Sequence, residues 1–291
     1  MTASKSFRIG TFEMARPMHM LPVLLAAVVA LILVAGSPNC WADDDGDEIP
    51  FDEANIFFEL NDTDGDLGIH ALIDGEPWKK LEIEDPRERE ILDICVKGRL
   101  RRQGLTEIFF ESAEPTFDEL SPKRFFHRFP EGEYEIEGTT LEGDELESEV
   151  ELTHVMPAPP VPTVNGEPMA VQCDEEEPGY DAPTVTAPVV IAWDEVTMSH
   201  PDPEGAGAGV QPPIPVMIHN YEVVVEVELE VEGEEFTSVF SVVLPSDQTE
   251  VTIPEEFLAL GDKFKYEVLA REESHNQTAV ESCFEIEEIE E

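Results

Sequence analysis

The fold is decided by Leu258-Ala-Leu-Gly261-Asp-Lys-Phe264-Lys-Tyr266-Glu-Val268-Leu-Ala270. From Phe264 to Ala270, apolar residues alternate with mostly polar ones, which is the period of a β-strand with one buried face. The segment Tyr221-Glu-Val-Val-Val-Glu-Val-Glu-Leu-Glu alternates in the same way. Further upstream, an apolar run that starts at Val189 ends at Trp193. These runs predict strands of a sheet that buries one face.

The same residues resemble the fibronectin type III module, in which a late strand carries Leu-x-Pro-Gly-Thr-x-Tyr-x-Val-x-Val-x-Ala. The matching positions are Leu258, Gly261, Val268 and Ala270. Phe264 stands where the family has a tyrosine whose hydroxyl ties a corner of the sandwich to nearby backbone, and phenylalanine cannot form that bond. The resemblance implies a fibronectin type III-like β-sandwich over residues 184–288.

The preceding chain predicts a separate mainly β domain, of no assigned family, over residues 55–155. Strand-like runs such as Ile56-Phe-Phe-Glu-Leu60 are interrupted by one short helix between Ser121 and Phe129. Ser121 is expected to cap this helix, and Pro122 suits its first turn. Residues 156–183 are rich in proline and predict an extended, semi-rigid linker. Residues 43–54 form an acidic leader with little to bury, which predicts a flexible segment.

The first 42 residues predict a secretory signal peptide, and hence a secreted or periplasmic protein. Basic residues precede an apolar run from Leu21 to Gly36, and small residues, Cys40 and Ala42, stand at the −3 and −1 positions of a cleavage site. The apolar run is shorter than the ~20 residues that a membrane-spanning helix needs. The alternative is an uncleaved segment that anchors a surface protein in the membrane.

The charge of the chain limits its partners. Its 66 Asp and Glu residues against 17 Lys and Arg give a formal net charge of −49. Such a surface repels nucleic acid and anionic lipid, so neither is expected as a partner once the signal peptide is removed. Basic residues concentrate between Lys79 and Arg128, and the next one is Lys263.

Within this basic segment, an interaction patch of Arg99, Arg101 and Arg102 is expected to contact carboxylates of the sandwich or of another copy, because guanidinium groups bind carboxylates through two hydrogen bonds. The alternative is that these residues offset the acids of their own domain.

A turn with alternating aspartates gives the one metal-like signal in the sequence. Asp62, Asp64 and Asp66 can converge on a hard cation such as Ca²⁺. The positions that an EF-hand loop fills with Gly and Glu are Leu67 and Ile73 here, so the turn is not an EF-hand. The alternative is a solvated acidic turn of a β-hairpin.

Three cysteines remain after the signal peptide, namely Cys95, Cys173 and Cys283. Export favours disulfides. The first and last segments of a sandwich of the fibronectin type III kind can run close together, which implies the pair Cys173–Cys283. The alternative is three buried free thiols.

No catalytic motif is present. The sequence has no His-Glu-x-x-His pair and no Gly-x-Ser-x-Gly elbow. Asn276-Gln-Thr278 fits the pattern of an N-glycosylation site. The sequence therefore predicts an exported, non-catalytic binding or spacer protein that acts through its β modules, with a protein or carbohydrate at the cell surface, or a second copy, as partner. The alternative is a secreted enzyme whose site lies in the first domain.

Overall fold

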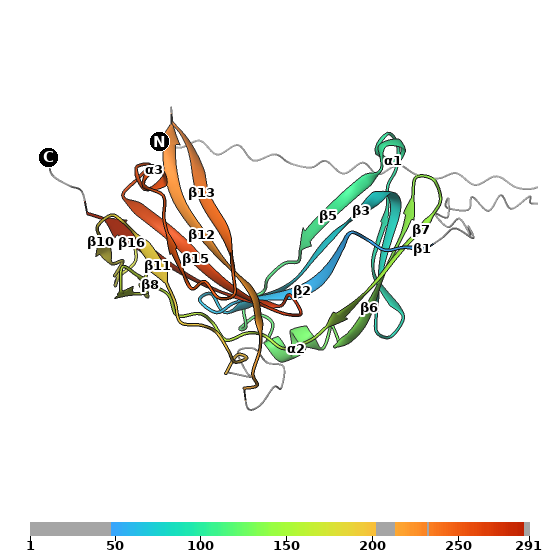
Figure 1. Ribbon diagram of the computed structural model, residues 1–291, viewed down its shortest axis with the longest axis horizontal. Helices are drawn as coiled ribbons and strands as arrows, with labels where there is room; N and C mark the ends of the chain where they lie inside the picture. Colours follow the sequence, from blue (N-terminus) through green and yellow to red (C-terminus); the bar gives the residue numbers. More distant parts are fainter. Residues whose placement is uncertain (1–47, 202–212, 232, 288–291) are drawn as a thin grey trace, which may run out of the picture. The chain divides into compact units, whose positions relative to one another are not determined.

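The computed structural model describes residues 48–201, 213–231 and 233–287 (Figure 1). The predicted signal peptide, residues 1–42, lies outside the described residues and stays a prediction. All described residues belong to one compact unit. None of the helices within these ranges is long and apolar enough to cross a membrane.

The chain is mainly β, as the sequence predicts. Its strands are β1 (Glu48–Ile49), β2 (Glu53–Asn61), β3 (Asp66–Asp85), β4 (Arg89–Cys95), β5 (Leu105–Glu111), β6 (Gly132–Thr140), β7 (Glu145–Leu152), β8 (Thr163–Val164), β9 (Glu167–Pro168), β10 (Thr184–Val185), β11 (Val190–Ala192), β12 (Ile218–Val231), β13 (Glu234–Pro245), β14 (Glu250–Thr252), β15 (Lys263–Glu272) and β16 (Gln277–Ile286). The acidic leader therefore contributes β1 and the start of β2.

Three short helices accompany the strands, namely α1 (Leu100–Gln103), α2 (Pro122–Phe126) and α3 (Glu255–Leu258). The helix that the sequence predicts is α2, and Pro122 lies in its first turn. Ser121 stands at the N-cap, but its side chain makes no capping hydrogen bond, so that detail of the prediction is wrong. Phe125 and Phe126 are buried against Phe58, with ring centroids 5.8 and 5.1 Å from that ring.

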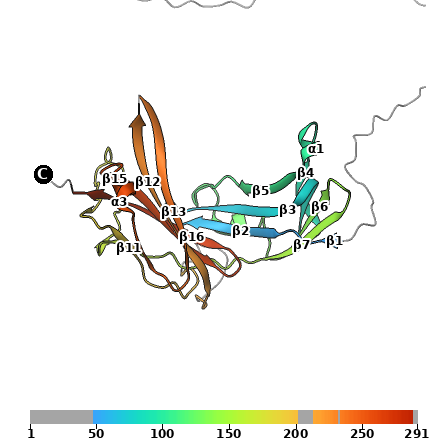
Figure 2. The ribbon, with the colours of Figure 1, turned by 45° about the horizontal axis from the view of Figure 1, so that its top comes forward.

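Most strands form one large sheet. Its order is β1, β7, β6, β3, β2, β16, β15, β12 and β13; in addition, β4 and β5 pair with β3, and β10 pairs with β16. A second sheet has the order β14, β11, β8 and β9. β12 and β13 form a long antiparallel hairpin whose tip extends beyond the neighbouring strands (Figure 2).

Two hydrophobic cores lie along the large sheet. The first contains buried side chains from Phe51 to Met156, including the fully buried Trp78. The second contains side chains from Val164 to Phe284, and it lies between the large sheet and the small one. Tyr221, which starts the alternating run on β12, packs edge-on against Trp193, with ring centroids 5.2 Å apart. The second core is therefore the β-sandwich that the sequence predicts.

A tyrosine corner occurs in the first core. The hydroxyl of Tyr134, near the start of β6, donates a hydrogen bond to the carbonyl of Pro130 at 3.0 Å. This is the type of bond that Phe264 cannot make in the second core. In Pro130-Glu-Gly-Glu-Tyr134, the proline precedes the tyrosine by four residues, as in the fibronectin type III motif, but the glycine precedes it by two residues rather than three.

The Pro-rich segment 156–183 is not a free spacer, and that prediction is corrected. It contains β8 and β9, and Val164 is fully buried in the second core. Its prolines lack an N–H, but its carbonyl groups still accept hydrogen bonds. The Thr278 hydroxyl donates to the Pro157 carbonyl at 2.7 Å, and the Ala170 N–H donates to Ser282 Oγ at 2.9 Å. The segment is therefore folded onto β16.

The two cores are connected by a short parallel pairing of β2 with β16, which we call the join. Its register places Glu59 opposite Gln277, Leu60 opposite Thr278, and Asn61 opposite Ala279. Because these residues are 218 positions apart in the chain, the pairing is a tertiary contact rather than a hairpin.

The side chain of Asn276 stabilises the join through hydrogen bonds. Its side chain is fully buried at the turn between β15 and β16. Its Oδ1 accepts a hydrogen bond from the Phe58 N–H at 2.8 Å, and its Nδ2 donates to the carbonyls of Thr153 and Val155 at 2.9 and 3.0 Å. One amide therefore holds β2, the segment after β7 and the start of β16 together. A side chain this enclosed is not available for glycosylation in the folded protein.

Candidate functional site

One face of the large sheet points away from both cores, and we call it the open face. On β2, Phe58 and Leu60 enter the first core, so Glu59 lies on the opposite face. On β16, Val280 and Phe284 enter the second core, so Glu281 lies on the opposite face. Strand register then places on the open face Asn61, Asp66, Gly68, His70, Gln277, Glu267, Arg271, Glu222 and Glu226.

Glu59, His70 and Glu114 form the one group of potential metal ligands found among the described residues, and we call it the His70 cluster. Their ligand atoms all lie within 4.8 Å of one another. His70 Nε2 is 2.9 Å from Glu114 Oε1, and His70 Nδ1 is 3.7 Å from Glu59 Oε2. His70 is 4% exposed, so its imidazole is held away from bulk water.

Glycine at position 68 makes room for Glu114. A Cβ added to Gly68 would lie 2.2 Å from Glu114 Oε1 and 2.8 Å from its Cγ. The loop that carries Glu114 is fixed to β3, because the Ile69 N–H donates to Ser112 Oγ and the Ser112 N–H donates to the Ile69 carbonyl, both at 3.0 Å. A glycine within a strand often marks such a close approach, and this was the one sequence signal that could have located the cluster.

Several carboxylates lie close together on the open face. Burial, with smaller contributions from Glu59 and Glu281 among others, raises the pKa of Glu267 to about 8. Burial and then the charge of Glu114 raise the pKa of Asp66 to about 6. Burial also raises the pKa of Glu59, while the charge of His70 and a hydrogen bond from Gln277 oppose that rise. These groups lack sufficient neighbouring positive charge, so the face favours a proton or another cation.

The raised pKa values predict a protein that becomes less stable as the pH rises. An acid with a higher pKa in the folded chain contributes its full stabilisation below the unfolded value, near 4, and loses it as the pH rises through the folded value. The stabilising contribution of Asp66 is lost as the pH rises through about 6, and that of Glu267 is lost as the pH rises through about 8. We expect Glu267→Gln to raise the free energy of unfolding at pH 8 by on the order of 1–3 kcal/mol and to flatten its pH dependence.

Urea unfolding between pH 5 and pH 8 measures this effect. Glu228→Gln is the matched control, because Glu228 is an exposed residue of the neighbouring strand β12. An unchanged pH dependence in Glu267→Gln would contradict the assignment.

The three aspartates of the turn have different surroundings in the structure. Asp62 Oδ1 lies 2.9 Å from His200 Nε2, and Asp62 is partly exposed. Asp64 is exposed, whereas Asp66 is partly buried and interacts electrostatically with Glu114 and Glu59. The structure thus places one of the three predicted ligands beside the His70 cluster, while calcium binding itself stays a prediction.

The arginine patch lies at and just before α1. Arg99, Arg101 and Arg102 are exposed, and within the described part of the chain no ion pair involves them. Contact of this patch with another copy stays a prediction.

Cys173 and Cys283 are joined by a disulfide in the structure, with 5.8 Å between their Cα atoms. Cys95 is also disulfide-bonded, so the alternative of three free thiols is wrong.

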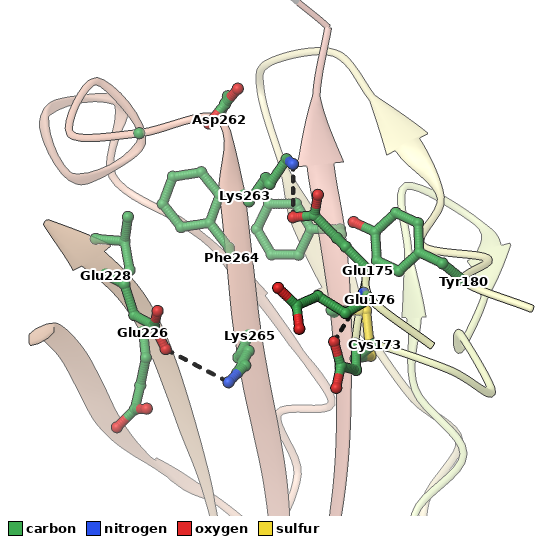
Figure 3. A pocket seen from close by; sticks show the side chains of 15 residues that line it. Cys173, Glu175, Glu176, Tyr180, Glu226, Glu228, Asp262, Lys263, Phe264 and Lys265 are labelled. Carbon is green, nitrogen blue, oxygen red and sulfur yellow. Dashed lines mark hydrogen bonds and ion pairs between the residues drawn. A yellow bond between two sulfur atoms is a disulfide. The ribbon is translucent and has the colours of Figure 1, made fainter. Parts of the chain in front are cut away.

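The Cys173–Cys283 bridge borders an open cavity of about 780 Å³ (Figure 3). Lys263 Nζ pairs with Glu175 Oε1 at 2.5 Å, and the Tyr180 hydroxyl donates to Glu285 Oε1 at 2.7 Å. Lys265 Nζ lies 3.5 Å from Glu228 Oε1 on the adjacent strand, β12. The cavity is thus lined by acids with two lysines among them, and the His70 cluster is not part of its wall.

No family model matches the chain, and no characterised protein matches it by sequence. Solved structures with a similar arrangement include the fibronectin(III)-like modules of Clostridium thermocellum CbhA, at 12% identity and a TM-score of 0.23, covering 86% of this chain and 97% of that one. A 1.5-MDa bacterial ice-binding adhesin matches at 9% identity and a TM-score of 0.20, over 83% and 66% of the two chains. The BSP domain of a biofilm associated protein matches at 10% identity and a TM-score of 0.21, over 82% and 30%. At these TM-scores none of the matches bears on the function of this chain.

Proposed function

We propose that this chain is an exported, non-catalytic binding or spacer protein whose two β cores act as one rigid unit and whose open face binds a divalent cation. The observation that carries the proposal is the double role of Glu59. Its carboxylate belongs to the His70 cluster, and it also accepts a hydrogen bond from Gln277 across the join. A cation bound at Glu59 therefore acts where the two cores meet.

The composition of the cluster selects the class of cation. One imidazole nitrogen with two carboxylates is a ligand set suited to ions such as Zn²⁺ or Mn²⁺. Ca²⁺ prefers oxygen ligands alone, and the aspartate turn would supply those. Burial, together with the charges of neighbouring carboxylates, raises the pKa values of Asp66 and Glu59, and a bound divalent ion would stabilise their ionised forms. Binding to the folded state alone stabilises that state by mass action.

Thermal unfolding with added metal tests the proposal. At a Zn²⁺ concentration about 100 times the dissociation constant, the fold should gain about 2.7 kcal/mol, which corresponds to a rise in Tm of roughly 5–10 °C. His70→Ala and Glu114→Gln should remove most of that rise, and a chelator should reverse it in the unmodified protein.

Glu107→Gln is the matched control, because Glu107 is an exposed residue of β5, the strand that precedes Glu114. No shift with Zn²⁺, Mn²⁺ or Ca²⁺ would contradict cation binding. A shift with Ca²⁺ alone, lost in Asp64→Asn but kept in His70→Ala, would move the site to the aspartate turn.

A further inference from the structure

β13, the strand at one end of the large sheet, has a long unpaired edge with few charges, which is unusual for this chain. β13 pairs with β12 on one side, and within the described ranges no strand pairs with its other side (Figure 2). Such an edge offers a row of unpaired N–H and carbonyl groups to another strand. Native proteins commonly block a long edge with charges or prolines along its length.

β13 lacks that protection. Every residue from Phe236 to Leu244, in Phe-Thr-Ser-Val-Phe-Ser-Val-Val-Leu, is uncharged, although charged residues make up 29% of the chain. Pro245 comes only at the end of the strand. Phe236, Val239 and Val243 are 48%, 52% and 54% exposed. The neighbouring strand β12 carries glutamates at four positions, so the neutral run is confined to the edge.

We propose that this edge pairs with the β13 edge of a second copy, in an antiparallel arrangement about a two-fold axis at Phe240. This inference is independent of cation binding. In that register Phe236 lies opposite Leu244, and Val239 lies opposite Ser241 of the other copy. All nine pairs are then neutral, and Glu235 meets Pro245 rather than another acid. Pairing of this length forms about eight to ten hydrogen bonds between the backbones.

The choice of a second copy follows from the register, because a two-fold axis at Phe240 pairs the neutral run with itself and sets Glu235 opposite Pro245, whereas the net charge opposes association. The chain carries a net charge of −49, so two copies repel each other over most orientations. Edge pairing places the nearest glutamates of the two β12 strands three strand spacings apart, about 14 Å. That distance exceeds the Debye length of about 8 Å at physiological salt, so the repulsion between the two β12 strands is screened. Glu234 and Glu235 at the start of one β13 lie nearer to Asp247 of the other copy, and added salt weakens that repulsion. Association should therefore strengthen as salt is added.

Sedimentation velocity on the purified protein, from roughly 10 to 500 µM and at about 0.05 and 0.5 M NaCl, tests the proposal. We expect a monomer–dimer equilibrium that shifts toward the dimer at high salt. Val239→Lys should raise the dissociation constant at least tenfold. Lysine lowers the net negative charge, so weaker association of this variant cannot be due to greater repulsion. Val239 is exposed, and the variant should unfold at the temperature of the parent.

Val161→Lys is the matched control, because Val161 is 70% exposed and lies away from β13. It should dimerise like the parent. A monomer at every concentration and salt level would overturn the proposal. So would a dimer that Val239→Lys leaves intact, or one that Val161→Lys weakens equally.

Discussion

Replacing Asn276 with alanine should lower the free energy of unfolding by about 3–5 kcal/mol, one of the two largest effects expected of the changes considered for this chain. The alanine leaves the Phe58 N–H and the carbonyls of Thr153 and Val155 without their partner. Each buried polar group that loses its partner costs about 1–3 kcal/mol. Urea unfolding at neutral pH measures the difference.

Two further variants isolate the cause. Asn276→Asp keeps the acceptor for Phe58 but replaces the donor atom with an oxygen that faces two carbonyls, so it should destabilise at least as much as alanine. Asn55→Ala is the control, because Asn55 also belongs to the β2 region but makes one exposed hydrogen bond, to Glu53. It should change the stability by less than about 1 kcal/mol. A similarly small change in both Asn276 variants would show that the join does not depend on this amide.

The sequence could predict the second core because its signals are local. The alternation on β12 and β15 marks which side chains are buried, and Tyr221, Val223, Phe264 and Val268 are indeed in that core. The tyrosine corner of the first core is equally local, but its Pro130-Glu-Gly-Glu-Tyr134 run departs from the Pro-Gly-Thr-x-Tyr order of the fibronectin type III motif. The short runs of β8 and β9 gave no periodic signal, and the composition of their Pro-rich segment suggested a spacer instead.

The join and the His70 cluster could not be predicted in the same way. Asn276 matches a glycosylation pattern, and only its tertiary contacts show that it is a buried structural amide. Glu59, His70 and Glu114 come from β2, β3 and the loop after β5, and each looks like an ordinary strand or loop residue. With 66 acidic residues in the chain, no pair of carboxylates is informative until strand register brings particular ones together.

Removing the bridge between Cys173 and Cys283 should destabilise the protein by about 4–5 kcal/mol, because the bridge closes a very long loop in the unfolded chain. The two residues are 110 positions apart, and closing that loop removes much of the conformational entropy of the unfolded state. The double variant Cys173→Ser, Cys283→Ser leaves Cys95 unchanged, so the effect belongs to this bridge. Urea unfolding of the parent and the variant measures the loss.

The same variant should also loosen the wall of the cavity in Figure 3. The bridge fixes the segment that carries Glu175 and Tyr180 against β15 and β16, where they pair with Lys263 and Glu285. Those two contacts are partly exposed and therefore weak, so they contribute little to holding residues 171–181 once the bridge is gone. Amide hydrogen exchange should therefore accelerate between residues 171 and 181 in the double variant. Lys263→Gln, which removes the ion pairs of Lys263 with Glu175 and Glu285 and keeps the bridge, should leave the exchange near that of the parent. A loss of stability below about 1 kcal/mol together with unchanged exchange would mean that packing, and not the bridge, holds this segment in place.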